Sequence, residues 1–331
     1  YDEETAGGIM TSDFVAVSAD MTAAQAIAHI GSLELEEPVY FAYVVSTTGH
    51  LQGYIQLWEL LKTTHLQQPL STLAVKDTIS VQTDTDQEEV ARTASKYDLS
   101  SLPVLDLNGI LVGRITVDDI IDVIEEEASE DIFKLAGSSD SELEYSSPLH
   151  ACKARLPWLM ITLFAGFVSS LILKQFIDHH IIALSFFVPI IMAMGGNTGI
   201  QSSTLIIRGL AVGSIDERGL SKLLLRELAA GALMGIMCGT IIGIWSVFMV
   251  GANSEIPAIY LAFTVGTSLF AAMTFAAVFG AFAPLVLNRL KADPAVASGP
   301  FVTASNDILA LLIYYGVTVG LILLRTQLLG A

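Results

Sequence analysis

Five long apolar stretches fill the second half of the chain. Each reaches the roughly 20 residues of helix that cross a hydrocarbon layer about 30 Å thick. A soluble core does not need five consecutive runs of this length, so the pattern predicts an all-α transmembrane domain with five helices over residues 151–331. The expected spans are about 157–177, 182–207, 223–250, 257–287 and 301–324.

A shorter pattern marks residues 1–128, where strand and helix signals occur twice. Residues 15–26 align with 79–90, and similar segments follow each of them. Each copy reads strand, helix, strand, strand, helix. This order predicts an α+β pair of repeats, at about 9–64 and 73–128.

Two of the expected helices start with the residues of a capping box. In this motif the first side chain and one three residues later each bond the other's backbone amide. The pairs are Thr22 with Gln25 and Thr85 with Glu88. They predict equivalent helix starts in the two repeats.

Charge divides the chain at the same place. The net charge is −18 although the mean hydropathy is +0.61, a combination that no single solvent explains. Residues 1–150 hold 27 Asp and Glu against 6 Lys and Arg, whereas residues 151–331 hold 7 against 10. Two solvents are therefore implied, with an acidic domain in water and a nearly neutral domain in lipid.

Basic residues in the connections set the expected orientation. The positive-inside rule places residues 1–155 in the cytoplasm and the C-terminus outside. The basic residues on the expected inner side are Lys153, Arg155, Arg208, Arg218, Lys222, Arg226, Arg289 and Lys291, against Lys174 and Arg325 outside. The chain begins at Tyr1 without a signal-peptide pattern, and we expect a segment upstream to be left out.

Polar residues interrupt the second apolar stretch. Pro189 precedes Gly195, Gly196, Asn197 and Gly199. Pro and three Gly in one span are expected to disturb the helical backbone, which is tolerated at membrane depth where it lines a wet cavity. Carbonyl oxygens freed in this way can coordinate a cation, as in selectivity filters. A kinked helix with a packing role is the alternative, and close packing is also expected where Gly recurs every four residues from 231 to 243.

The last stretch contains an acid well inside it. Asp307 follows Asn306, and a charge near the bilayer centre costs on the order of 3 kcal/mol. That cost predicts a role in a cation pathway, unless Asp307 lies at a helix end at the interface. Asp293, before Pro294, is a candidate for the cytoplasmic mouth of the pathway or for the start of a turn. Oxygen ligands of this kind favour Mg²⁺, Ca²⁺, Mn²⁺ or Na⁺ over Zn²⁺.

The segment after the second repeat is the most charged in the chain. Its apolar residues share one helical face, and its acids cover the remainder. The apolar residues are Val117, Ile120, Ile121 and Ile124, and the acids include Asp119, Asp122, Glu127, Glu130 and Asp131. A solvated face and a divalent-cation site are the two interpretations. Asp86 and Glu88 are candidates for a further water-rich site, because the EF-hand loop that they suggest lacks its Gly.

Together these motifs resemble a known family. The repeats, of which the second contains Gly113-Arg-Ile-Thr116-Val-Asp-Asp119, resemble a pair of cystathionine-β-synthase (CBS) motifs. The CBS pair, the acidic connection, five spans and the run from Pro189 to Gln201 resemble the magnesium transporter E (MgtE) family over essentially all 331 residues. Family members usually carry another acidic helical domain before the CBS pair, which is expected to be absent here.

The resemblance implies a homodimeric Mg²⁺ channel in the cell (inner) membrane, with its pore between two membrane domains. It implies closure at high Mg²⁺, through Mg²⁺ binding to the CBS pair and to a gating helix at about 129–150. It also implies ATP or another adenine nucleotide at the CBS pair, with Thr116 and Asp119 as candidate contacts. The implied pore ligands are Asp307, Asn306, Gly195, Gly196, Asn197 and Asp293, and the implied regulatory ligands are Asp86, Glu88, Asp98, Asp119, Asp122, Glu127, Glu130 and Asp131.

Three other functions stay open. A carrier that exchanges divalent cations for H⁺ or Na⁺ is the main alternative, although five spans do not divide evenly into the inverted repeats of many carriers. An anion channel is disfavoured by Asp307 and by the acidic domain, and a nucleotide-sensing scaffold is the third. No nucleophile–base pair or phosphate loop indicates an enzyme, and Cys152 and Cys238 form no zinc or disulfide pattern.

Overall fold

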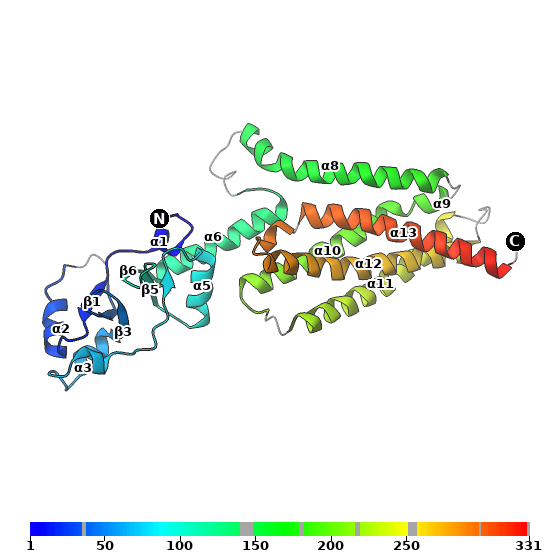
Figure 1. The fold of residues 1–331 in the computed structure, drawn as a ribbon. Helices are drawn as coiled ribbons and strands as arrows, with labels where there is room; N and C mark the ends of the chain where they lie inside the picture. Colours follow the sequence, from blue (N-terminus) through cyan, green and yellow to red (C-terminus); the bar gives the residue numbers. More distant parts are fainter. Residues whose placement is uncertain are drawn as a thin grey trace. The chain divides into compact units, whose positions relative to one another are not determined.

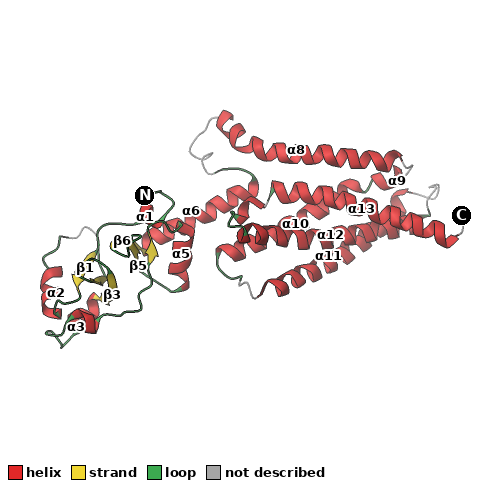
Figure 2. Cartoon of the chain, viewed as in Figure 1, coloured by secondary structure: helices red, strands yellow, loops and turns green. Residues whose placement is uncertain are grey.

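The chain forms two compact units, Tyr1–Ala128 and Ser129–Ala331 (Figures 1 and 2). The computed structural model describes residues 1–34, 38–139, 148–178, 182–215, 219–250, 257–297 and 299–329. The first unit mixes helices and strands and the second is helical, which confirms the predicted order of an α+β part and an all-α part.

The two repeats of the first unit fold alike. Each supplies a three-stranded sheet whose first two strands are parallel and whose last two are antiparallel, in the orders β1-β2-β3 and β4-β5-β6. The register shifts at the same place in both sheets, at Val44/Val45 and at Val104/Leu105. The elements are α1 (Ala6–Ile9), β1 (Val15–Ser18), α2 (Ala23–Ile30), β2 (Phe41–Val45), β3 (Leu51–Gln56), α3 (Leu57–Lys62), α4 (Leu70–Leu73), β4 (Val81–Gln82), α5 (Gln87–Lys96), β5 (Ser101–Leu105), β6 (Leu111–Thr116) and α6 (Val117–Ala136). The predicted strand and helix order is confirmed.

Polar contacts join the two repeats, although each has its own apolar core. The Tyr43 hydroxyl and Ser101 Oγ are 2.8 Å apart, and burial raises the pKa of Tyr43 above its usual value. Arg114 is 3% exposed, and its Nε donates to the Asp13 carbonyl at 2.7 Å. A buried guanidinium needs such acceptors, so the loop before β1 is fixed against β6.

One of the two predicted helix starts is confirmed and the other is wrong by one residue. Thr22 and Gln25 form the expected capping box, with Thr22 N donating to Gln25 Oε1 at 3.0 Å. In the second repeat the cap is Asp86, whose Oδ1 accepts from Glu88 N at 2.9 Å. Thr85 lies one residue before this cap, and its Oγ1 accepts from Gln82 N in the preceding turn.

Helix α6 runs unbroken for 20 residues, and its last residues belong to the second unit. Only Ile120 of the four residues predicted to share its apolar face lies in the core, together with Val123. Val117, Ile121 and Ile124 are 46%, 57% and 45% exposed. The expected gating helix at 129–150 includes the end of α6, residues 140–147, which lie outside the described part, and the start of the next helix.

The second unit is built from long helices. Four of them, α8, α11, α12 and α13, are long and apolar enough to cross a membrane by length and composition. The remaining predicted span forms a short helix and then α10, which carries Gly, Asn, Thr, Gln and Ser residues near its centre. The helices are α8 (Pro148–Asp178), α9 (Ile182–Ser185), α10 (Val188–Ala211), α11 (Leu220–Val250), α12 (Ala258–Arg289), η2 (Pro294–Ala297) and α13 (Pro300–Leu329).

The backbone of α10 is helical throughout, so the predicted interruption is wrong. Pro189 lies in the first helical turn, where its missing amide hydrogen breaks no intrahelical bond. The glycines serve close packing instead, because a methyl group at Gly280 of α12 would lie only 2.8 Å from Gly199 Cα. The packing alternative is the one that the structure bears out.

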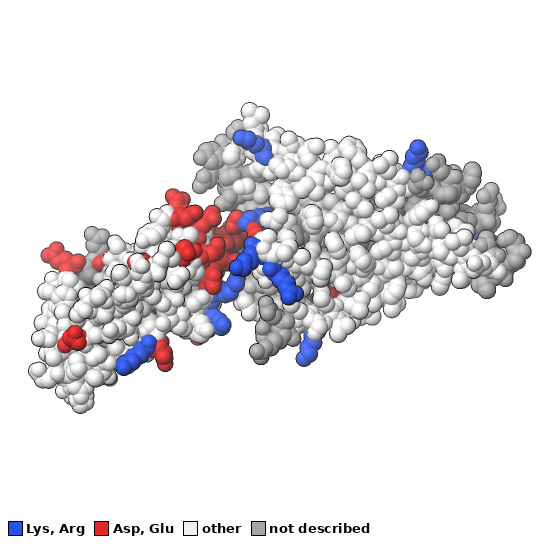
Figure 3. Space-filling model, viewed as in Figure 1, with Lys and Arg blue, Asp and Glu red and all other residues white. Residues whose placement is uncertain are grey.

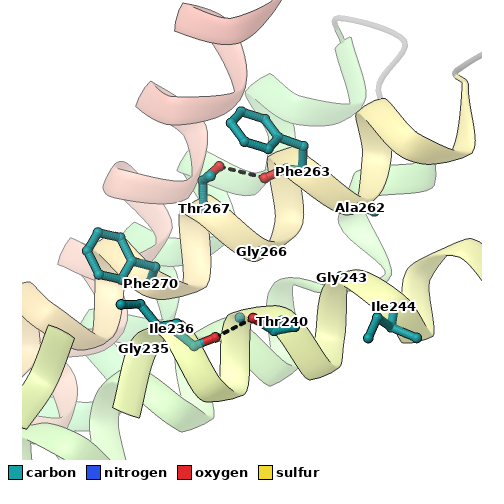
Figure 4. A pocket seen from close by; sticks show the side chains of 11 residues that line it. Gly235, Ile236, Thr240, Gly243, Ile244, Ala262, Phe263, Gly266, Thr267 and Phe270 are labelled. Atoms are coloured by element: carbon teal, nitrogen blue, oxygen red, sulfur yellow. Dashed lines mark hydrogen bonds between the residues drawn. The ribbon is translucent and has the colours of Figure 1, made fainter. Parts of the chain in front are cut away.

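Helices α11 and α12 approach closely along the predicted glycine stripe. A methyl group at Gly239 would lie 2.5 Å from the Gly266 carbonyl oxygen, and one at Gly266 would lie 2.8 Å from that of Gly239. Figure 4 shows the groove along this contact, where the Thr240 and Thr267 hydroxyls donate to carbonyls of their own helices. The small-residue packing prediction is confirmed.

Charge follows the same division into units. In Figure 3 the acidic side chains gather around α5 and α6, while this face of the helical unit is mostly uncharged. In the apolar segment that is long enough to cross a membrane, 44% of the residues of α12 are buried, against 11% of those of α8. Helix α12 is therefore central within the unit, and α8 leaves most of its surface for other contacts.

Candidate ion pathway

The side chain of Asp307 lies against the glycine run of α10. Asp307 belongs to α13, and a methyl group added at Gly196 would lie 3.4 Å from its Oδ1. One turn along α13, Ala310 contacts Gly195, where an added methyl group would lie 3.1 Å away. Because these glycines have no side chains, the carboxylate approaches the α10 backbone. The structure thus brings together predicted pore groups from two distant segments.

Asn306 is buried between the same helices. It is 1% exposed, and a methyl group at Gly199 would overlap its Nδ2. Within the described part of the chain, neither its amide nitrogen nor its amide oxygen has a hydrogen-bond partner. Leaving a buried polar group unpaired costs about 1–3 kcal/mol. An unpaired buried amide beside a half-buried carboxylate therefore indicates a role beyond folding.

Asn197 lies on another face of α10. It is exposed, whereas Gly195, Gly196 and Gly199 are buried. Within one chain, the structure therefore does not bring the Asn197 side chain against Asn306.

Asp293 both starts a turn and pairs with a lysine. Its Oδ1 accepts from Ala295 N at 2.8 Å, at the start of η2, and its Oδ2 accepts from Lys134 Nζ at 2.6 Å. Lys134 also contacts Glu130 Oε1 at 2.5 Å, one turn earlier on α6. Partial burial opposes the lysine charge, but the bonds to Asp293 and Glu130 outweigh it and raise the pKa of Lys134. Asp293 and Glu130, which were both predicted to bind a metal cation, thus both pair with the ammonium group of Lys134.

Three predicted regulatory acids lie around the start of α5. Asp86 caps this helix, and Glu88 pairs with Arg92 at 2.8 Å. Glu127 of α6 accepts from Gln87 Nε2 at 2.7 Å, which ties α6 to the same helix start. The sequence spacing of 40 residues gives no hint of this contact, which depends on the fold of the repeat.

The other predicted acids do not converge on one point. Asp119 accepts from Thr116 N at 3.0 Å and from Thr116 Oγ1 at 2.5 Å, so the two candidate nucleotide contacts bond each other. Asp98 and Asp122 are exposed, and Asp131 is half-buried. Across the described residues, no group of three or more His, Cys, Asp or Glu side chains is arranged to hold a metal ion.

Two parts of the chain match known families. Residues 188–317 match the MgtE family, described as divalent cation transporter, and residues 70–126 match the CBS domain. The first match includes the contact between α10 and α13, and the second includes the start of α5 and most of the acidic segment.

Curated relatives match over almost the whole chain. The magnesium transporter MgtE of Thermus thermophilus is 39% identical over 96% of this chain, and that of Bacillus subtilis is 36% identical over 97%. The matches cover 70% of each relative, so the chain spans about that share of their length. The chain belongs to the MgtE family. The resemblance read from the motifs is thereby confirmed.

Two solved structures are similar to part of the chain. One is the soluble part of a magnesium transporter, with 39% identity, a TM-score of 0.36, and coverage of 39% of this chain and 50% of that one. Another is the cytosolic domain of the Mg²⁺ channel MgtE in complex with ATP, with 39% identity, a TM-score of 0.35, and coverage of 37% and 50%. MgtE membership and four apolar helices together indicate a membrane protein.

Sequence reasoning missed an acid that this MgtE-family chain buries in α11. Glu227 is 8% exposed, and its Oε2 accepts from Ser202 of α10 at 2.9 Å. Its Oε1 accepts from Arg226 at 3.1 Å. The sequence could have indicated Glu227, because it is an acid within the apolar stretch 223–250. The same feature identified Asp307. Glu227 ties α10 to α11 a few residues after the glycine run.

A tyrosine holds the other end of α10. Tyr314 of α13 is fully buried, and its hydroxyl donates to the Leu184 carbonyl at 2.8 Å. Leu184 lies in α9, just before the turn that leads into α10, and its carbonyl also accepts from Phe187 N at 3.1 Å. The bond was not predictable from the sequence, because Tyr in an apolar stretch is ordinary.

Proposed function

We propose that this chain conducts Mg²⁺ across a membrane, through a pore lined by α10 and α13 between two copies of the chain. The proposal rests on one observation, which is that Asn306 and Asp307 lie against the glycines of α10. A half-buried carboxylate and an unpaired amide form an oxygen-rich site for a hard cation that keeps part of its water. Gly195, Gly196 and Asn197 would line the proposed pore next to this site. The relatives are named magnesium transporters rather than enzymes.

Exposure within the single chain favours a pore shared by two copies. Asn197 is exposed and Asp307 is only half-buried, as groups that face a path outside one chain must be. Val117, Ile121 and Ile124 form an exposed apolar stripe on α6, which a homodimer would cover.

The acidic first unit is proposed as the regulator of this pore. Two copies of it repel each other, and divalent cations bound to their carboxylates would reduce the repulsion and favour a compact, closed arrangement at high Mg²⁺. Several weak sites must act together to shift such an equilibrium. The proposed sites are Asp86, Glu88, Asp98, Asp119, Asp122, Glu127, Glu130 and Asp131. The end of α6, within the proposed gating segment 129–150, would pass the change to the pore.

Orientation and nucleotide binding complete the proposal. The distribution of Lys and Arg supports an orientation with the CBS pair in the cytoplasm and the C-terminus outside. An adenine nucleotide would contact Thr116 and Asp119 where β6 meets α6, and Asp119→Asn should then lower ATP retention in equilibrium dialysis.

Uptake by proteoliposomes tests the conduction. We expect the purified chain to admit Mg²⁺ with currents far above carrier turnover, and Asp307→Ala to abolish uptake while the protein stays dimeric. Thr240→Val is the matched control, since Thr240 lies in the groove of α11 and bonds only its own helix in the described contacts. Full uptake by Asp307→Ala would remove Asp307 from the pore, and carrier-like turnover would favour cation exchange.

A further inference from the structure

One face of α13 lies along α10 and carries the proposed ion site (Figure 1). Tyr314 is on the same face, two helical turns after Asp307. Its hydroxyl donates to the Leu184 carbonyl at 2.8 Å, so the contact of α13 continues onto the segment that leads into α10. The pairs before it, in order along α13, are Asn306 with Gly199, Asp307 with Gly196 and Ala310 with Gly195.

The contacts at the glycines have little directional preference. Glycine presents no side chain, so α13 meets a smooth strip of the α10 backbone there. The Asn306 amide makes no hydrogen bond within the described part of the chain, although it lies against Gly199. Apolar contact is non-directional, whereas a hydrogen bond weakens steeply with a change in distance or angle. A directional contact outside the glycine strip is therefore needed to set the register, which is the position of α10 along α13.

The bond from Tyr314 supplies such a contact. Tyr314 is fully buried in an apolar cluster that includes Leu184 and Phe187. A hydroxyl in such a place needs a hydrogen-bond partner, and the Leu184 carbonyl is available at the end of α9. Because Tyr314 and Asp307 belong to one continuous helix, the bond fixes the lead-in to α10 relative to the Asp307 carboxylate.

We propose that Tyr314 is a positioning residue that sets the register of α10 along α13, and thereby the ion preference of the Asp307 site. Mg²⁺ demands near-octahedral oxygen positions at about 2.0–2.1 Å and keeps several waters, whereas Ca²⁺ accepts more oxygens at longer and more variable distances. A site of fixed spacing favours Mg²⁺, and a site whose walls can shift admits Ca²⁺. The inference rests on the proposed function, because it concerns the same site.

Uptake of Mg²⁺ and of Ca²⁺ by proteoliposomes tests the proposal, with the full chain and with its Tyr314→Phe variant. Phe fills the same space, and the Leu184 carbonyl keeps its bond from Phe187 N at 3.1 Å, so the variant should fold. We expect the ratio of Ca²⁺ to Mg²⁺ initial rates at equal concentrations to rise several-fold. This ratio does not depend on how much protein is active, so a general loss of structure would leave it constant. An unchanged ratio would overturn the proposal.

Two further variants show whether the hydroxyl bond itself is responsible. Thr318→Val removes another buried hydroxyl from α13, one that has no hydrogen-bond partner in the described part, and should keep the parent ratio. p-Aminophenylalanine at position 314 restores a donor at the same place and should bring the ratio back toward that of the parent. An equal rise in Thr318→Val, or no recovery with the restored donor, would also overturn the proposal.

A stabilised background covers the case in which Tyr314→Phe is not recovered as folded protein. The change is then combined with Gly316→Ala, where a methyl group meets no described atom within 4 Å and favours the helix. A double variant that still does not fold would make Tyr314 a requirement for folding and overturn the proposal. Absence of Mg²⁺ uptake by the unmodified chain would refute the proposed function, and this inference with it. A conducting chain whose ratio is the same with and without the hydroxyl would refute this inference alone.

Discussion

The acids of the two units live in opposite surroundings. In the first unit they are numerous and mostly exposed, and the described ones serve local tasks, as Asp86 does by capping α5 and Glu88 by pairing with Arg92. In the second unit Asp307 is half-buried against α10 and Glu227 is buried against Ser202. A carboxylate in water costs nothing to keep, whereas one inside a bundle needs a compensating role. The proposed regulation therefore rests on the numerous exposed acids of the first unit, and the proposed ion path rests on the half-buried Asp307 of the second.

The largest effect should come from closing the space beside the proposed pore groups. Gly280→Ala places a methyl group against the Gly199 backbone, 2.8 Å from its Cα and 2.9 Å from its carbonyl carbon. Overpacking against backbone costs about 1–3 kcal/mol, occasionally more, and it pushes α12 away from α10. We expect loss of Mg²⁺ uptake and a lower Tm.

Gly316→Ala is the matched control, because a methyl group there meets no described atom within 4 Å. It should keep uptake and leave the Tm unchanged or slightly higher, since Ala favours helix over Gly. Equal losses in both variants would show that the effect is general to Gly→Ala in these helices.

The next prediction separates stability from conduction at Asn306. Asn306→Leu removes an unpaired buried amide while keeping a similar shape, which should raise the free energy of unfolding by about 1–3 kcal/mol. The same change should abolish uptake if the amide contacts the ion. Thr318→Val, which also removes an unpaired buried group, should raise stability and keep uptake. A stable, fully active Asn306→Leu would break the link between burial and the ion path.

A smaller effect is expected at Glu227, which we regard as a positioning residue for α10. Glu227→Ala leaves Ser202 and Arg226 without their carboxylate and should cost about 1–3 kcal/mol. The maximal uptake rate should fall several-fold while the Mg²⁺ concentration for half-maximal uptake stays constant. Glu227→Gln keeps an acceptor for Ser202 and should recover most of the rate. A shifted half-maximal concentration would instead make Glu227 an ion ligand.

The sequence predicted most of the architecture and part of the site. The order of strands and helices could be predicted because each repeat carries its own local pattern of apolar and polar residues. The long apolar runs predicted helices by their length alone. The sequence did not predict that α10 is continuous, because Pro189 and the glycines are poor helix formers in isolation. Pro189 is tolerated because it lies in the first turn, and the glycines are explained by their contacts with α12 and α13. Gln87 with Glu127, and Lys134 with Asp293, join residues 40 and 159 apart. Such pairs depend on tertiary geometry, which spacing cannot supply.

Neutralising the acids of the first unit should have a graded effect. Asp86→Asn, Glu88→Gln and Glu127→Gln together should raise the Mg²⁺ concentration for half-inhibition of uptake several-fold, because linked weak sites each shift the equilibrium slightly. The charge-matched control changes Asp20, Glu59 and Asp77, which are exposed elsewhere in the first unit. An equal shift in the control would mean that net charge, and not position, is sensed.

The smallest effect is expected for the exposed ion pair between Arg92 and Glu88, which tests whether the exposed acids of the first unit lack structural roles. Arg92 and Glu88 have side chains 42% and 40% exposed, so their ion pair contributes about 0–1 kcal/mol. Arg92→Gln should therefore leave the Tm almost unchanged. It also frees Glu88 from a competing cation, so inhibition should occur at slightly lower Mg²⁺, by less than about threefold. Lys96→Gln, on the same helix, should leave both quantities as they are. A large loss of stability in Arg92→Gln would mean that exposed acids of the first unit carry structural roles like those buried in the second.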